Sequence, residues 1–241
     1  MHRSPILVSS LSAALLALSA SSLVAQEPAA QVHQTEVRPT GQIEYKAKDF
    51  SHLFGMPGFG DKLLKDHFTL YAGYVKNTNL LTSILNDLAA DGKQRMPPWA
   101  EIKRRFGWEF DGMRLHELYF ENLGGRDPIA KSSPLYKKMV DQWGSFDGWK
   151  NDFYATGIMR GIGWAILYQD KETGQLFNIW INEHDLGHLA GGTPLLAMDV
   201  WEHAYMPQYG LDRAAYIEAF YKNIDWRVVE KRYESANPKA V

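Results

Sequence analysis

The chain has 241 residues, of which 45% are hydrophobic and 13% aromatic, enough to bury one large core or two small ones. Its formal net charge of −2 provides no basic field, so nucleic acid is not an expected partner. The absence of cysteine excludes disulfides, thiolate metal ligands and catalytic thiols.

Residues 1–25 are typical of a signal peptide rather than of a folded element. A basic start precedes an apolar stretch that ends in Ala25, a small residue of the kind found at signal-peptidase cleavage sites. The sequence therefore predicts cleavage near Gln26 and export to the periplasm or the medium, with no stable membrane insertion afterwards. Because the stretch nearly reaches membrane-spanning length, a membrane anchor is the alternative.

The chain up to residue 128 is expected to consist of a flexible lead-in, 26–60, and a helical domain, 61–128. The lead-in begins with polar residues that show no apolar period and ends in a turn rich in Pro and Gly. Beyond it, apolar residues recur at helical spacing. The expected elements are a long helix or a helix pair from Lys62 to Gly92, a short helix from Pro97 to Phe106, and another helix from Asp111 to Leu123.

A break at 124–128 marks the boundary to a C-terminal domain, 129–241. This domain mixes helical periods with short strand-like runs, an order that favours an α+β fold with helices packed on a small antiparallel sheet. Helices are expected at 135–143, at 146–155 and twice within 212–233, and strands at 164–169 and 176–182. A further apolar run, 193–198, fits a strand or a buried helix equally well.

Acidic and imidazole side chains follow this apolar run. Asp199 and His203 are four residues apart and can converge on one point if the chain turns there. Burial of a carboxylate beside apolar neighbours is costly unless a cation or hydrogen bonds compensate it. One carboxylate and one imidazole make half of a site suited to manganese, iron or zinc. A capped turn after a core strand is the alternative.

Two more histidines, His67 and His116, fall within the apolar sectors of the expected helices, where an imidazole without a partner would be penalised. Taken singly, each histidine fits an ordinary core or surface role better than a metal site. Together with Asp199 and His203, however, they would give three neutral nitrogens and one anion, with a position left open for solvent or substrate on a redox metal.

The segment from Asp199 to Tyr205, Asp-Val-Trp-Glu-His-Ala-Tyr, resembles the signature of the iron/manganese superoxide dismutases. The resemblance extends over 61–233 and includes Gly-Ile-Gly-Trp-Ala at 161–165 and Asn-Ile-Asp-Trp at 223–226. It implies the same two-part α+β fold, a homodimer, and disproportionation of superoxide to oxygen and hydrogen peroxide. It also implies one iron or manganese ion per subunit, with ligands His67, His116, Asp199 and His203.

The resemblance further implies roles for residues near the metal. Tyr74 resembles a gateway tyrosine whose hydroxyl bonds through water toward the metal-bound solvent, although an ordinary core tyrosine fits as well. His184 stands where the family carries a Gln, or in some branches a His, that bonds this solvent. Gly112 occupies the alternative position for such a Gln and cannot supply it.

Other residues are expected to enclose the site or to join two subunits. Trp164 and Trp201 would wall the metal pocket, and Glu202 would cross a dimer interface to hold the partner's metal-binding histidine. Met206 and Tyr71 depart from the residue types that meet across this interface in the family, which leaves the usual dimer geometry open.

Three alternatives remain at the level of the sequence. The Tyr-Val pair begins seven residues after His67 where the family has eight, so Asp66 is the rival first ligand. Three histidines and an aspartate also suit a zinc hydrolase, and a catalytically inactive metal-binding or interaction protein of the same fold is a further possibility. The ligand set does not separate iron from manganese.

Overall fold

The computed structural model describes residues 44–236, which fold into seven α-helices, one short 3₁₀ helix and three strands. The proposed signal peptide and the first part of the lead-in lie outside the described residues. No helix among residues 44–236 is both long enough and apolar enough to cross a bilayer.

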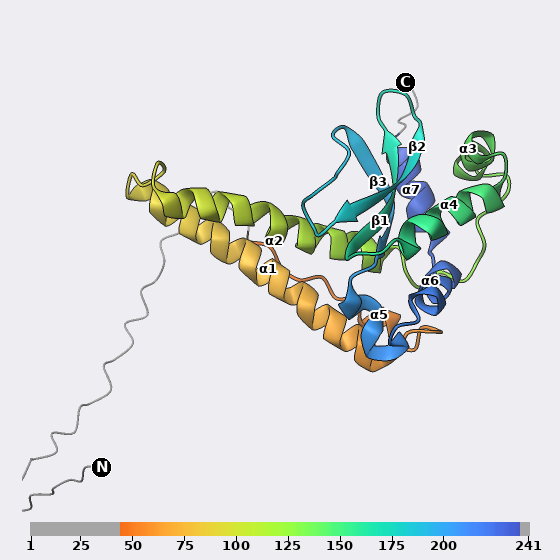
Figure 1. Ribbon diagram of the computed structural model, residues 1–241, viewed down its shortest axis with the longest axis horizontal. Coiled ribbons are helices and arrows are strands. Elements are labelled where there is room, and N and C mark those ends of the chain that lie inside the picture. The colour runs from red at the N-terminus through yellow and green to blue at the C-terminus, as the bar shows by residue number, and fades with distance from the viewer. Residues whose placement is uncertain (1–43, 237–241) are drawn as a thin grey trace, which may run out of the picture. The chain divides into compact units, whose positions relative to one another are not determined.

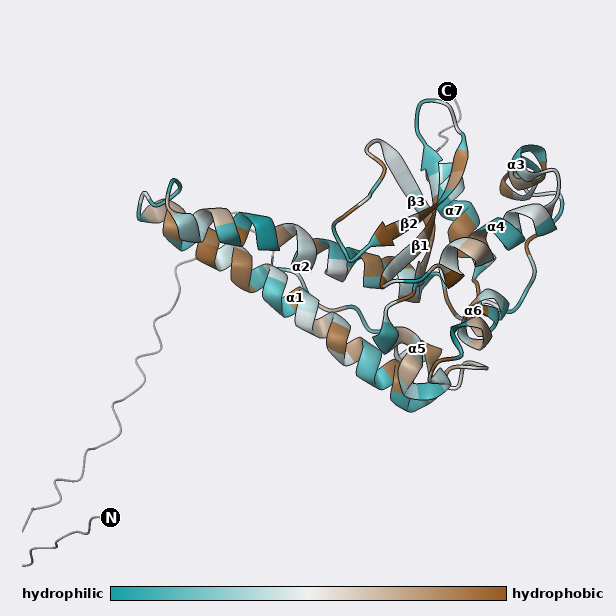
Figure 2. Cartoon of the chain, in the orientation of Figure 1, coloured by the Kyte–Doolittle hydropathy of each residue, from teal (hydrophilic) through white to brown (hydrophobic). Residues whose placement is uncertain are grey.

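Two long antiparallel helices, α1 (Asp61–Ala90) and α2 (Pro97–Glu121), form the N-terminal hairpin (Figure 1). Along both helices hydrophobic and hydrophilic residues alternate, as expected for helices with one buried stripe (Figure 2). The buried side chains of α1 recur at helical spacing: Leu63, Leu64, His67, Tyr71, Val75, Thr78, Leu81 and Leu85. Of the two alternatives for this segment, one long helix or a helix pair, the structure has one long helix.

The expectation of separate helices ending at Phe106 and beginning at Asp111 was wrong, because α2 is continuous. Gly107 lies in the helix interior, where a glycine costs about 1 kcal/mol relative to alanine. No proline follows to block the helix, and packing against α1 and the sheet offsets this small cost.

The expected flexible lead-in was wrong for residues 44–60, which pack against the helical hairpin. The backbone N–H and C=O of Tyr45 each bond the side-chain amide of Asn79 at 2.9 Å. A short 3₁₀ helix, Ser51–Leu53, follows. The apolar side chains of this segment are buried: Phe50, Leu53, Met56 and Phe59. Their spacing matches neither a strand nor a helix, so periodicity did not reveal their burial.

The C-terminal part has helices around a three-stranded antiparallel sheet with the order β2-β1-β3 (Figure 1). Its elements are α3 (Pro134–Trp143), α4 (Phe146–Ile158), β1 (Gly163–Asp170), β2 (Leu176–Asn182), β3 (Gly192–Asp199), α5 (Glu202–Tyr209), α6 (Arg213–Lys222) and α7 (Trp226–Ala236). The fold is α+β, as expected, and the ambiguous apolar run is β3. The central strand β1 is buried along nearly its whole length, because helix α4 and the neighbouring strands cover it.

Asn122, the residue that ends α2, fixes the edge strand β3 near its C-terminal end. Its side-chain Oδ1 accepts the N–H of Ala197 at 2.9 Å, and its Nδ2 donates to the C=O of Ala197 at 3.2 Å. The amide thus takes the place of a strand partner on the open edge of the sheet. This pairing fixes the position of Asp199, two residues after Ala197, relative to α2.

Candidate metal centre

Four side chains from four elements meet at one point. His67 comes from α1, His116 from α2, Asp199 from the last position of β3 and His203 from the first turn of α5. Asp199 Oδ1 accepts the N–H of Trp201 at 2.8 Å, which forms the tight turn between β3 and α5. This turn brings Asp199 and His203 to the same side, as their spacing predicts.

One carboxylate oxygen, Asp199 Oδ2, is the centre of the cluster. It lies 3.1 Å from Nε2 of His67, 3.1 Å from Nε2 of His203 and 3.6 Å from Nε2 of His116. The four ligand atoms all lie within 4.8 Å of one another. Asp66 lies on the exposed side of α1, where it pairs with Lys62 at 2.5 Å, so His67 rather than Asp66 belongs to the cluster.

The hydrogen bonds of His116 show what the cluster requires. Its Nδ1 lies 2.6 Å from the carbonyl oxygen of Gly112, which can only accept, so Nδ1 carries the ring proton. Its Nε2 therefore presents a lone pair, yet this atom is buried and has no hydrogen-bond partner. A buried acceptor without a partner is costly, and a cation at this point would supply the partner.

The charges of the cluster are also those of a cation site. Burial lowers the pKa of both His67 and His116, so both imidazoles stay neutral and keep a lone pair. Burial by itself would raise the pKa of Asp199, but His203 and His67 beside it lower this pKa below its usual range. Three imidazole nitrogens and one carboxylate are a donor set that fits iron, manganese or zinc.

Next to the cluster, His184 is held between Trp164 and Tyr74. The Nε1–H of Trp164 donates to His184 Nδ1 at 3.1 Å, and His184 Nε2 lies 2.7 Å from the Tyr74 hydroxyl. Burial lowers the pKa of His184 to about 4, so the ring is neutral near pH 7 and has one N–H. Since Nδ1 accepts from Trp164, that proton is on Nε2 and is donated to Tyr74.

The rings of Trp164 and Trp201 lie beside this arrangement. The edge of the His116 ring meets Trp164 at a centroid distance of 5.1 Å. Trp201 stacks on His184 at 4.8 Å and on the His203 ring at 5.9 Å. The indole rings therefore shield the sides of the cluster from water, and small molecules can approach it only where no indole lies.

Tyr71 and Glu202 differ in how far they reach the surface. Tyr71 is buried: its hydroxyl donates to Glu117 at 3.0 Å and its ring stacks on His116 at 6.3 Å. Tyr71 is therefore covered by its own chain and lies beside His116, one of the four ligand candidates. Glu202 and Met206, by contrast, are exposed on α5.

Sequence reasoning missed three residues around the site. Trp108 contacts the His184 ring at 4.9 Å, and the Arg105 guanidinium lies over the Trp108 ring at 4.9 Å. Tyr216 donates its hydroxyl to the Asp199 carbonyl oxygen at 2.5 Å, which fixes the backbone of the ligand. The spacing of Arg105 and Trp108 with His116 on one helix was the available signal, but the expected break in α2 concealed it.

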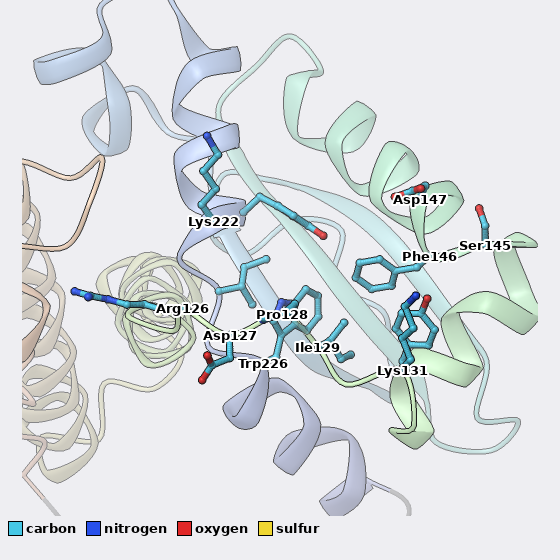
Figure 3. Close-up of a pocket in the computed structure, with 13 residues that line it drawn as sticks. Arg126, Asp127, Pro128, Ile129, Lys131, Ser145, Phe146, Asp147, Lys222 and Trp226 are labelled. Atoms are coloured by element: carbon cyan, nitrogen blue, oxygen red, sulfur yellow. The ribbon is translucent and has the colours of Figure 1, made fainter.

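A hollow of about 570 Å³ lies elsewhere, between the segment after α2, the start of α4 and the start of α7 (Figure 3). Its lining includes Phe146 and Trp226 together with the cations Arg126, Lys131 and Lys222. It shares no residue with the histidine cluster. Its three cations are exposed. Within residues 44–236, the group of side chains that could hold a metal ion is the histidine cluster.

Known proteins resemble this chain over most of its length. Residues 131–232 match the family model described as iron/manganese superoxide dismutases, C-terminal domain. The chain is 35% identical to a superoxide dismutase [Fe] of Cupriavidus metallidurans over 187 residues, covering 75% of this chain and 91% of that protein. It is 34% identical to superoxide dismutase [Mn] 2 of Haloferax volcanii over 170 residues, covering 70% and 84%.

A superoxide dismutase [Fe] of Aquifex aeolicus is 33% identical over 201 residues, covering 81% of this chain and 94% of that protein. Covering 75% and 81% of this chain, the two matches to superoxide dismutases [Fe] are longer than the C-terminal domain and therefore extend into the helical hairpin. With four ligand-type side chains gathered at one point, they place this chain in the iron/manganese superoxide dismutase family.

Proposed function

We propose that this protein is a superoxide dismutase with one iron or manganese ion per chain, held by His67, His116, Asp199 and His203. The observation that carries this proposal is the buried lone pair of His116 Nε2, which faces Asp199 without a hydrogen-bond partner. The bound ion would supply the one-electron chemistry of both half-reactions by alternating between its +3 and +2 states.

The residues beside the cluster supply and direct protons. Two superoxide anions give one oxygen and one hydrogen peroxide, so two protons must reach the reduced anion. Burial raises the pKa of Tyr74, and its hydroxyl is protonated near neutral pH. Because the Tyr74 oxygen accepts the N–H of His184, its own proton is free to point to the enclosed space beside the metal cluster.

These hydrogen bonds give Tyr74 and His184 roles that differ from those implied by the resemblance to the family. A glutamine at position 184 would have two N–H groups, whereas neutral His184 has one, and Tyr74 takes it. Tyr74 is therefore the group that donates toward metal-bound solvent, and His184 orients Tyr74. Trp164 sets the tautomer of His184 on which this direction depends.

Arg105 is the cation best placed to attract the superoxide anion. Its guanidinium lies over Trp108, which contacts His184, and Arg105 is the arginine among the charges that lower the pKa of His184. Its pairing with Glu109 at 2.6 Å fixes the guanidinium at this position while leaving more than half of the side chain exposed. A cation at the entrance raises the association rate of a small anion.

The proposal includes a homodimer formed through α5. Glu202 and Met206 are exposed there, next to His203, whose Nε2 is directed at Asp199. The other ring nitrogen, Nδ1, could then donate to Glu202 of the partner subunit, which would fix the tautomer of His203. Light scattering of the wild-type protein and of Glu202→Ala tests this: a wild-type monomer at micromolar concentration contradicts the proposal.

We also propose that the protein is exported. The support is the basic start, the apolar stretch over 6–25 and the small residue Ala25 before Gln26. Fractionation of the native host, with mass determination of the N-terminus, tests the proposal. A protein that keeps its N-terminal residues and stays in the cytoplasm would contradict it.

Metal analysis combined with a superoxide assay tests the proposed activity on protein purified from its native host. Dismutase activity with stoichiometric iron or manganese is expected. Stoichiometric zinc without dismutase activity would instead indicate a hydrolase, and an empty, inactive protein would indicate a non-catalytic member of the family. The metal found in the native protein also decides between iron and manganese.

A further inference from the structure

His188 lies in the loop that joins β2 to β3, outside the metal cluster and its tryptophan walls. Its Nε2 lies 2.7 Å from the backbone carbonyl oxygen of His184, four residues earlier. Its Nδ1 lies 2.6 Å from the hydroxyl of Tyr168, a buried residue of β1. The ring thus joins the loop that carries His184 to the central strand of the sheet.

The donors in this pair of contacts can be assigned from chemistry. A carbonyl oxygen only accepts, so Nε2 of His188 carries a proton and donates it to His184. In the neutral ring Nδ1 then has the lone pair, and it accepts the hydroxyl proton of Tyr168. Burial raises the pKa of Tyr168, which keeps that hydroxyl protonated. Both hydrogen bonds are short and each has one consistent donor.

The loop needs such a support because its backbone is strained at Glu183. This residue has φ of 57°, in the left-handed region that costs a non-glycine residue about 1 kcal/mol or more. The adjacent backbone bonds between Asn182 and Leu186, at 3.0 and 3.3 Å, close the turn below His184. They leave the His184 carbonyl itself to His188.

We propose that His188 is a positioning residue for His184: by holding the His184 carbonyl against β1 through Tyr168, it keeps the imidazole of His184 on Tyr74. The inference rests on the proposed function, because Tyr74 is there the proton donor. His188 does not contact the proton donor Tyr74 and affects it only through His184. Asp111, 3.8 Å from His188 Nε2, faces the same ring from α2.

A double-mutant cycle tests whether His188 acts through His184. In the metal-loaded enzyme, His188→Ala is expected to lower kcat about tenfold with metal content unchanged, which is typical of residues that orient groups near a metal. In a His184→Ala background, the same substitution should change kcat by less than about twofold, because the group that it positions is gone. An equal loss in both backgrounds, or no loss in the wild-type background, would overturn the proposal.

Two further variants separate positioning from a general effect on the loop. His188→Gln retains an N–H donor and an oxygen acceptor and should recover kcat to within about twofold of wild type. Tyr168→Phe removes one anchor and should give a smaller loss in the same direction. The exposed His52→Ala serves as the matched control and should leave kcat unchanged. A His188→Gln variant as impaired as His188→Ala would count against the assigned bonds.

A readout independent of activity keeps this inference separable from the proposed function. In protein loaded with diamagnetic Zn²⁺, nitrogen-15 spectra should show one protonated and one bare nitrogen in the His184 ring. In His188→Ala the two signals should move toward their mean as the ring loses its fixed partners. Unchanged His184 signals would refute the positioning role even in an active enzyme. A wild-type protein without dismutase activity but with this spectral response would contradict only the proposed function.

Discussion

Nε2 of His184 lies 2.7 Å from the hydroxyl oxygen of Tyr74, 110 positions away in the chain. This contact joins the loop after β2 to helix α1, beside the four metal-ligand candidates. Trp164 determines its direction by donating to the opposite nitrogen of the His184 ring. The direction matters because it decides which of the two residues can donate a proton to a bound solvent.

Replacement of His184 by Ala should leave the metal in place and reduce kcat by about tenfold, because the ligands are intact but Tyr74 loses its partner. His184→Gln should recover part of the loss, since an amide can accept from Trp164 and donate to Tyr74. Metal analysis and steady-state kinetics of both variants provide the measurement. Loss of metal from either variant would mean that His184 supports the ligands themselves.

Replacement of His116 by Ala should abolish metal retention and activity together. The substitution removes the only nitrogen of the cluster that is buried, bare and without a hydrogen-bond partner in the described chain. Metal content after dialysis and dismutase activity are the two measurements. Full metal occupancy in this variant would show that His116 is not a ligand.

Gly112→Ala should disturb Tyr74 while keeping the Gly112 carbonyl oxygen that accepts from His116. A Cβ atom at Gly112 would lie 2.7 Å from Cδ1 of the Tyr74 ring, closer than side chains approach one another. We expect a loss of about 1–3 kcal/mol in the free energy of unfolding, together with reduced kcat. At Gly73, also inside a helix, a Cβ meets nothing within 4 Å, so Gly73→Ala should instead stabilise the protein by about 0.5–1 kcal/mol.

Arg105→Gln should lower kcat/KM several-fold at low ionic strength and much less at high salt, because the charge acts on the approach of the anion. The neighbouring Arg104 is the matched control. It pairs with Glu101 on the exposed side of α2, and Arg104→Gln should leave kcat/KM nearly unchanged. Equal effects of the two substitutions would indicate net charge rather than position. Stopped-flow decay of superoxide at several salt concentrations measures both.

The stability of the protein should fall as the pH is lowered from about 6.5 to 4. Burial lowers the pKa of His184 from 6.5 to about 4, so in this window the unfolded chain binds a proton that the folded chain does not. Unfolding therefore takes up a proton, and His184 should account for a loss of about 2 kcal/mol between pH 7 and 4.5. Urea denaturation of wild type and His184→Gln at both pH values isolates this part, which the variant should lack.

The chain order of apolar periods and the residues around Asp199 were sufficient to predict the α+β fold and the four ligand-type side chains. Both are local signals. The helical spacing of apolar residues in α1 predicts one buried stripe, and Asp199 and His203 are only four residues apart. The choice of His67 over Asp66 depended on which side of α1 faces the core. His67 is buried beside Asp199 and Asp66 is exposed, which agrees with the spacing of the buried residues of α1.

Other features depended on contacts between distant segments, which no local pattern encodes. The order of residues 44–60 comes from their burial, and the continuity of α2 comes from packing that outweighs the cost of Gly107. The hydrogen bond from Tyr71 to Glu117 forms because α1 lies against α2. The sequence by itself determined which side chains are available for a metal site. Only the tertiary structure decided the direction of the hydrogen bonds around it, because each proton position depends on partners brought together by folding.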